Sequence, residues 1–309
     1  MEHTSVMLQQ CIDALNIKAD GIYVDGTLGR AGHASKILEK LTTGKLYGFD
    51  LDQQALEESR AKLESISSNF ELIYSNFADM KQQLQLRNVD KVDGILLDLG
   101  VSSPQFDDPD RGFSYRYDSR LDMRMDQNQT LDAYTIVNSY GYNDLVRILR
   151  EYGEEKNAVG IARKIEQARA EKPIETTGQL VEIIRSALPA RILNKKGHPA
   201  KQTFQALRIE VNHELDNLKK VIDDALNLLN SGGRLAIITF HSLEDEIVKK
   251  AFKSAATDEQ IDKRIPVKAS EIKQSDFVLV NKKVIIADEE ELAKNHRSHS
   301  AKLRVIERR

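Results

Sequence analysis

Apolar and polar positions alternate regularly over the first third of the chain. Four short apolar runs have the length and composition of strands: 21–25, 46–50, 70–74 and 92–99. Two segments between them carry apolar residues at helical spacing: 34–41 and 55–66. In the fourth run Ile95, Leu96 and Leu97 stand in succession, which is typical of a strand buried on both faces of a parallel sheet. The alternation predicts βαβ units and a doubly wound α/β fold.

The pattern changes after the fourth run. Residues 102–130 are polar and irregular. Apolar residues then follow helical spacing, in two stripes: 145–149 and 161–165. Thr176, followed three residues later by Gln179, predicts the start of a further helix. Because no run in 131–188 has strand character, we interpret this part of the chain as a helical insertion.

Strand character returns in the last third of the chain. The run 234–240 follows a turn at 231–233, and three further runs would complete the sheet: 277–280, 284–287 and 303–306. The α/β domain is therefore expected in two pieces, 1–104 and 209–309, with the helical insertion at 105–208. Substrate-recognition elements in such folds usually lie beyond the C-terminal ends of the strands, where this insertion would start.

Composition excludes several classes of protein. With 40% apolar and 30% charged residues over 309 positions, the chain is neither disordered nor fibrous. The net charge of −3 gives no global basic field, so any contact with nucleic acid must come from local patches. The single cysteine, Cys11, excludes a disulfide framework and a multi-cysteine zinc site. No apolar stretch reaches the roughly 18 residues of a membrane span, and the N-terminus lacks a signal-peptide pattern, so we expect a cytoplasmic protein with no membrane partner.

A glycine-rich loop follows the first predicted strand. Residues 25–33 read Asp-Gly-Thr-Leu-Gly-Arg-Ala-Gly-His, with the spacing G-x-x-G-x-x-G rather than the dinucleotide fingerprint G-x-G-x-x-G. Glycines let the backbone turn sharply and approach a ligand closely. An acid followed by such a loop resembles motif I of class I methyltransferases that use S-adenosylmethionine (SAM). A plain strand-to-helix turn is the alternative interpretation.

Three further residues stand where the predicted strands end. Asp50 could accept both hydroxyls of a ribose, in SAM or in NAD, or cap a helix, a task that suits Asp52 better. Phe77 could offer an apolar face to an adenine ring or belong to the core. Asp98 ends the fourth strand and would face the crevice where open α/β sheets bind ligands. It precedes Leu-Gly-Val, where methyltransferases acting on exocyclic amines usually have Pro-Pro-aromatic.

Longer strings make the resemblance specific. They lie at 98–105, 111–114, 121–126, 152–155, 198–200 with 203–209, and 240–245. With their neighbours they resemble the RsmH (MraW) family from His3 to Arg308. This family comprises bacterial enzymes that methylate N4 of a cytidine in the decoding region of 16S rRNA with SAM. The chain departs from the family pattern at Ser5 and in the tail 295–300, where His296 and His299 replace the usual Pro and Arg.

The resemblance implies roles for individual residues. It assigns these positions to the cofactor pocket: Ala31, Gly32, His33, Asp50, Phe77, Asp98 and Gln105. The first three would hold the methionine part of SAM, Asp50 the ribose hydroxyls, and Phe77 would line the adenine site. Asp98 and Gln105 would complete the pocket. No metal is expected.

The reaction needs a hydrogen-bond acceptor, because the N4 lone pair of cytosine is delocalised into the ring and must be aimed at the methyl group from about 3 Å. Asp98 is the first candidate, although it could instead touch only the cofactor. His241, which follows the strand 234–240, is a candidate proton acceptor or base contact, with helix capping or packing as the alternative.

Three basic stretches suit an RNA partner, expected to be 16S rRNA within the small ribosomal subunit. Residues 185–208 carry six cations and no acid, and residues 294–309 carry six cations against Glu307 alone. Between 111 and 124 four arginines interleave with three aromatic residues, a mixture that suits phosphate contact and base stacking. A solvated charged face is the alternative for each stretch. The sequence leaves open whether naked RNA is the substrate and whether the chain forms a homodimer.

The sequence allows four alternative functions to be compared with this one. An NAD-dependent oxidoreductase shares the fold and Asp50 but fails on the glycine spacing. A DNA amino-methyltransferase lacks support because the Pro-Pro-aromatic element is missing. Methylation of a small molecule would leave the basic stretches without a role. A ribosome-assembly factor that binds SAM without turnover stays open.

Overall fold

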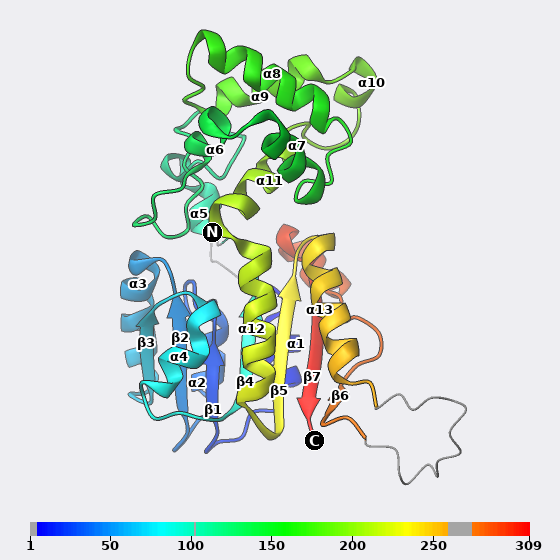
Figure 1. Cartoon of the computed structure of the whole chain (residues 1–309). Helices are drawn as coiled ribbons and strands as arrows, with labels where there is room; N and C mark the ends of the chain where they lie inside the picture. Colours follow the sequence, from blue (N-terminus) through cyan, green and yellow to red (C-terminus); the bar gives the residue numbers. More distant parts are fainter. Residues whose placement is uncertain (1–4, 102, 259–273) are drawn as a thin grey trace, which may run out of the picture. The chain divides into compact units, whose positions relative to one another are not determined.

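The computed structural model describes residues 5–101, 103–258 and 274–309 of the chain. It divides into two compact units, coloured along the chain in Figure 1. Unit 1 comprises Met1–Gly100 and Leu215–Arg309, and unit 2 comprises Val101–Glu214. Among the described residues, no helix is both long and apolar enough to cross a membrane. His3 of the N-terminal family string lies outside the described residues.

Unit 1 is built on a seven-stranded sheet of order β3-β2-β1-β4-β5-β7-β6. The strands are β1 Ile22–Asp25, β2 Lys45–Asp50, β3 Phe70–Tyr74, β4 Val92–Asp98, β5 Leu229–Thr239, β6 Phe277–Leu279 and β7 Lys302–Arg308. The first five lie parallel, and β7 runs antiparallel between β5 and β6. The predicted parallel α/β fold is therefore confirmed, with an antiparallel strand near one edge.

Helices cover both faces of this sheet, because successive residues of the central strands point to opposite sides. Leu96 packs in the cluster with the first three helices, whereas Ile95 and Leu97 pack in the cluster with α4, α12 and α13. The first three are α1 Leu8–Leu15, α2 Gly32–Leu38 and α3 Gln53–Glu64. The others are α4 Met80–Gln85, α12 Glu214–Leu228 and α13 Ser242–Ala255. The run Ile95-Leu96-Leu97 is thus buried on both sides, as its sequence predicts.

Two C-terminal predictions differ in detail. Residues 231–233 were expected as a turn, but they lie within β5 at a bulge. The register there jumps from the pair Val92 and Leu229 to the pair Gly94 and Arg234. The run 284–287 forms one isolated bridge between Ile285 and Leu303 instead of a strand. It is followed by α14 Glu289–Lys294 and the 3-10 helix η4 His296–Ser300.

Unit 2 is helical in the part that the structure describes. Its helices are α5 Ser103–Asp107, the 3-10 helix η2 Pro109–Arg111, α6 Ala133–Ser139, α7 Tyr142–Glu151, α8 Ala158–Glu171, α9 Thr177–Ala187, α10 Ala190–Leu193 and α11 Lys201–Asn212. Thr176 caps α9, and the Gln179 side chain closes a capping box, as the spacing predicts. The expected boundary at 208/209 falls inside α11. This helix continues because Phe204, Leu207 and Val211 pack in the core of unit 2.

Candidate cofactor and active site

The glycine loop begins where β1 ends, at the edge of the sheet where the parallel strands have their C-termini. Gly26 has no room for a side chain, since a Cβ there would lie 2.4 Å from Leu97 Cδ2 and 3.3 Å from Phe77 Cβ. Gly29 adopts φ +50°, and a Cβ built on it meets only the Thr27 carbonyl, at 4.0 Å. The loop is therefore packed tightly at Gly26 and open in front of Gly29.

Asp50 fastens the loop to the end of β2. Its Oδ2 accepts the Gly29 N–H at 2.7 Å, and its Oδ1 accepts the Asp52 N–H at 2.9 Å. Burial raises the pKa of Asp50 to about 6. A carboxylate has about four acceptor positions, so both oxygens retain capacity for hydroxyl donors. The helix cap falls to Asp52, whose Oδ1 accepts from Gln54 N at 3.1 Å.

Asp98 ends β4 beside this loop. Its N–H donates to the Thr27 hydroxyl at 2.7 Å. Its buried Oδ1 has no hydrogen-bond partner among the described residues. Burial raises the pKa of Asp98 to about 7, with the Arg297 guanidinium opposing the shift and Glu244 and Glu291 adding to it. A buried acceptor without a donor is costly in a folded protein, and such groups concentrate at functional sites.

Asp25, which had no predicted role of its own, is a second buried carboxyl group with a vacant acceptor. It is 1% exposed; its Oδ1 accepts from Thr27 N at 3.1 Å, and its Oδ2 has no partner among the described residues. Burial, with smaller contributions from the charges of Asp98 and Asp50, raises the pKa of Asp25 to about 6, against the opposing charge of His33. The signal in the sequence was its place directly before the glycine loop.

His33 links this loop to the N-terminal segment. Its Nε2 lies 3.0 Å from the Val6 carbonyl oxygen, and a carbonyl can only accept, so Nε2 carries the hydrogen. The lone pair on Nδ1 then faces Asp98 Oδ2 at 3.9 Å. Burial lowers the pKa of His33, which favours this neutral tautomer. A Cβ on Gly32 would fall 1.7 Å from Ser5 Oγ, so the N-terminal segment packs directly on the loop.

The other predicted site residues take different positions. Ala31 is fully buried in the left-handed conformation (φ 53°) and precedes α2. Phe77 starts a 3-10 helix, Phe77–Asp79, half-buried beside Gly26. Gln105 lies in α5 of unit 2, buried, and is the one predicted cofactor residue outside unit 1.

His241 occupies the N-cap position of α13, two residues beyond the end of β5. Its Nε2 lies 3.0 Å from Glu244 Oε1, and Glu244 Oε2 accepts the N–H groups of Phe240 and His241. Neither ring nitrogen makes a hydrogen bond within the described residues, so the contact with Glu244 Oε1 is an ion-pair contact only. At this N-cap position the capping hydrogen bonds thus come from Glu244, and the ring itself makes none in the part of the chain that the structure describes. A role in proton transfer remains a proposal.

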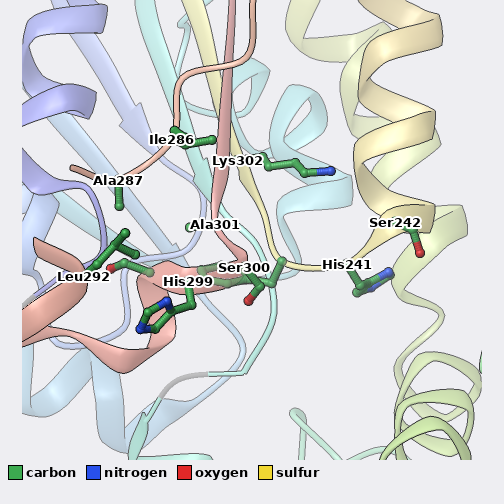
Figure 2. A pocket seen from close by; sticks show the side chains of 11 residues that line it. His241, Ser242, Ile286, Ala287, Leu292, His299, Ser300, Ala301 and Lys302 are labelled. Carbon is green, nitrogen blue, oxygen red and sulfur yellow. The ribbon is translucent and has the colours of Figure 1, made fainter. Parts of the chain in front are cut away.

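A cavity of about 340 Å³ lies beside His241 in unit 1. Figure 2 shows Ala287 and Leu292 on one side of it and His241 and Ser242 on the other. Its remaining walls come from Phe240, Ile286 and the segment 298–302. Of the two tail histidines that depart from the family pattern, His299 lines this cavity, and its ring centroid lies 5.1 Å from that of His296 in η4.

Ion pairing changes the interpretation of two basic stretches. In the tail, Lys302 and Arg304 both bind Asp245, at 3.0 and 2.7 Å, and Lys294 binds Glu290 at 2.6 Å. These cations are largely neutralised by acids that are distant in sequence or one helical turn away. Part of the tail's positive charge is therefore paired within the fold, and a contact between the tail and RNA stays a prediction.

The arginines between 111 and 124 are mostly structural as well. Arg111 donates to the carbonyls of residues 124 and 125. Arg120 binds Asp122 and Asp132, and Arg124 binds Asp122. Phe113 of the same stretch is buried. In this stretch, Arg116 and Tyr117 keep exposed side chains.

The third basic stretch keeps exposed charge. Arg191, Lys195, Lys196 and Lys201, around α10 and the start of α11, are exposed and form no ion pair within the described parts of the chain. Arg185 and Arg208 of this stretch instead face Glu182, at 3.9 Å, and Glu214, at 2.7 Å. We refer to the four exposed cations as the basic loop of unit 2.

Sheet order, the antiparallel β7, and a glycine loop and acid at the ends of β1 and β2 together define a class I SAM-dependent methyltransferase fold. The sequence profile described as the MraW methylase family matches residues 1–309. The chain belongs to this family, and its cofactor is SAM.

Named relatives agree with the family. The chain is 53% identical over 307 residues to "Ribosomal RNA small subunit methyltransferase H" of Exiguobacterium sibiricum, covering 99% of this chain and 98% of that protein. It is 52% identical over 308 residues to the protein of the same name from Oenococcus oeni, with the same coverage. A crystal structure described as a putative rRNA-methylase from Clostridium thermocellum overlaps at TM-score 0.47 and 12% identity, covering 99% of this chain and 100% of that one. The assignment rests on the sequence relatives, because this structural overlap is loose.

The residues at this edge of the sheet fit SAM. The cofactor carries hydroxyl and ammonium donors, and the edge offers three carboxyl groups with vacant acceptor positions, on Asp25, Asp50 and Asp98. The open space before Gly29 admits a ligand close to the backbone.

Proposed function

We propose that the protein transfers the methyl group of SAM to the exocyclic N4 of a cytidine in the decoding region of 16S rRNA. The name of the relatives, which specifies the RNA of the small ribosomal subunit, supports the RNA class. The family resemblance supports the cytidine and its N4. The structural observation that carries the proposal is the vacant, buried Oδ1 of Asp98 beside the glycine loop. An rRNA substrate places the reaction in the cytoplasm.

In this proposal, the cofactor is held mainly by unit 1. The backbone of residues 31–33 holds the methionine part, and Asp50, already anchored by two backbone N–H groups, accepts the ribose hydroxyls. Phe77 presents its ring to the adenine beside Gly26. The family resemblance also assigns Gln105, in α5 of unit 2, to the cofactor. SAM supplies an electrophilic methyl group on its sulfonium.

Asp98 then acts on the target amine. Its carboxylate accepts an N4 hydrogen, which orients the nitrogen lone pair towards the methyl carbon. Transfer of the methyl group to N4 would require the amine to lose a proton, and by this assignment the Asp98 carboxylate would accept it. A pKa of about 7 suits a base that works at neutral pH. His241, held by Glu244, is the candidate second contact to the base.

RNA binding is assigned to the basic loop of unit 2. Reversing the charge of Lys195 and Lys196 together should weaken binding of 16S rRNA. The slope of log K for RNA binding against log salt concentration should decrease in magnitude by about 2, while SAM affinity stays unchanged. Lys282 and Lys283 offer a matched control, since this adjacent pair in unit 1 is also exposed and without an ion pair within the described residues. An unchanged RNA affinity across a salt series, or an equal loss in the control, would remove the basic loop from the interface.

The reaction is tested with labelled SAM. The protein is incubated separately with unmodified 16S rRNA and with unmodified small subunits, and the RNA is digested to nucleosides and identified by mass. Label in N4-methylcytidine is the expected result, and label from subunits alone would make the folded subunit the substrate. Label in another nucleoside would overturn the target. Absence of label despite SAM binding would favour an assembly factor.

A further inference from the structure

Glu291 joins two segments from opposite ends of the chain. This residue lies in α14, and its Oε1 accepts the Met7 N–H at 2.5 Å and the Ser298 hydroxyl at 2.6 Å. Ser298, in η4, is 2% exposed. A single carboxylate oxygen therefore connects the N-terminal segment to the last turn before β7. Hydrogen bonds to an ionised acceptor are among the stronger ones in proteins.

The N-terminal segment also contacts the glycine loop, so it connects Glu291 to His33. Val6 and Met7 are buried, and Met7 takes the left-handed conformation (φ 51°, ψ 38°), which is uncommon for a residue with a side chain. In this conformation the Met7 N–H reaches Glu291, and the preceding Val6 carbonyl accepts from His33 Nε2 at 3.0 Å. His33 Nδ1 in turn faces Asp98. We call residues 5–7 the strap.

The charge of Glu291 also reaches the buried groups of the site. It raises the pKa of Asp98 and of His33, whereas Arg297 lowers that of Asp98. The other charged groups that act on Asp98 and His33 are Glu244 of α13 and Asp25 of β1. The segment from α14 to η4 thus places one acid and one base beside the reacting edge of the sheet. The same segment lines the cavity of Figure 2 through Leu292 and Ser298.

We infer that Glu291 is a positioning residue for the methyl-transfer site: it holds the strap on the glycine loop and so orients His33 towards Asp98. The assignment of Asp98 as the base rests on the proposed function. The effect of Glu291 on the cofactor loop does not rest on the proposed function, because SAM binding is independent of the RNA target. If Glu291 had a purely structural role, it would contribute to stability without affecting SAM affinity or the titration of Asp98 and His33.

Two substitutions separate the hydrogen bonds from the charge. Glu291→Ala removes both and should weaken SAM binding about tenfold, the scale expected for loss of a charged hydrogen bond. Glu291→Gln keeps an acceptor oxygen for Met7 and should weaken SAM binding by less than about threefold. Since Gln lacks the negative charge, the acid limb of the rate profile, set by Asp98, should move to lower pH by roughly half a unit or more.

Three measurements make the test decisive. SAM affinity is measured by calorimetry without RNA, the His33 imidazole is titrated by NMR, and the rate of methyl transfer is followed against pH. Loss of Glu291 charge should lower the His33 pKa, because that charge raises it. Glu290→Gln is the matched control: its carboxylate binds Lys294 on the surface of the same helix, so SAM binding and both titrations should stay unchanged.

The inference is overturned if Glu291→Ala binds SAM as the wild type does, or if Glu291→Gln leaves both titrations unmoved. A drop in melting temperature alone, with SAM affinity and titrations intact, would reduce Glu291 to a structural staple and also overturn it. Calorimetry and NMR require no RNA. If 16S rRNA proves not to be the substrate, the proposed function fails while the role of Glu291 is still decided.

Discussion

Replacing Asp98 by asparagine should make the protein more stable at alkaline pH and far less active. The carboxyl group of Asp98 is largely buried, with one oxygen lacking a partner among the described residues, and burial raises its pKa to about 7. In the unfolded chain an aspartate titrates near 3.9. The folded state therefore binds the proton more tightly than the unfolded state, and the resulting cost to stability grows as the pH rises from about 4 to about 7.

The size of this cost follows from the two pKa values. Each unit of difference is worth about 1.36 kcal/mol, so the ionisation of Asp98 lowers the free energy of unfolding by about 1.5 kcal/mol at pH 5 and about 4 kcal/mol at pH 8. Asparagine has nearly the same shape and does not ionise. The stability of Asp98→Asn relative to wild type should thus improve by about 2.5 kcal/mol between pH 5 and pH 8.

Denaturant unfolding of both proteins at pH 5 and pH 8 measures this difference directly, without SAM. Methyl transfer by the variant, measured in parallel, should fall by about 10² or more, as for loss of a well-placed polar group in a transition state. If the stability difference were the same at both pH values, Asp98 would not be desolvated in the folded protein, and the argument for its pKa would fail. Full activity would remove Asp98 from the mechanism.

Two more substitutions test individual contacts. Thr27→Val removes the hydroxyl that accepts the Asp98 N–H at 2.7 Å and should lower the free energy of unfolding by about 1–3 kcal/mol. Thr27→Ser keeps the hydroxyl and should lower it by less. Equal melting curves for the two variants would show that this hydrogen bond does not contribute to stability. Arg124→Gln removes the ion pair with Asp122 and the hydrogen bonds to the carbonyls of Gln127 and Gln129, so it should destabilise unit 2 by about 2 kcal/mol or more in a thermal melt. The salt dependence of RNA binding should stay the same. A smaller slope of log K against log salt would show that Arg124 contacts the RNA after all.

The strands of unit 1 could be predicted because their signal is local. Residues 70–74 form β3 as expected, and the other predicted strands of the first third end within one residue of their observed limits. The capping box at Thr176 is local as well. The bulge at 231–233 could not be predicted from the local sequence, because glycines there suit a turn equally well. The bulge forms only because β5 pairs with β4 on both sides of these residues.

Function-bearing contacts were harder to predict because they join distant parts of the sequence. Asp245 neutralises Lys302 and Arg304, which are more than fifty residues away along the chain, so counting cations in the tail overstated its free charge. The contact between Met7 and Glu291 spans almost the whole chain. A single sequence shows which groups are present near each other in the chain, but not which of them will be paired in the fold.

Three buried carboxyl groups, on Asp25, Asp50 and Asp98, lower the stability of the fold at this edge of the sheet. Burial raises the pKa of each of them to between about 6 and about 7, so near neutral pH ionisation of each carboxyl group lowers stability relative to its protonated form. Two of them also keep an oxygen without a donor in the part of the chain that the structure describes. A fold selected for stability alone would have no reason to gather three such groups around one loop. Their cost is explained if donors of a bound cofactor and a reacting amine complete the missing bonds, and binding of SAM should therefore stabilise unit 1 more strongly at pH 8 than at pH 5.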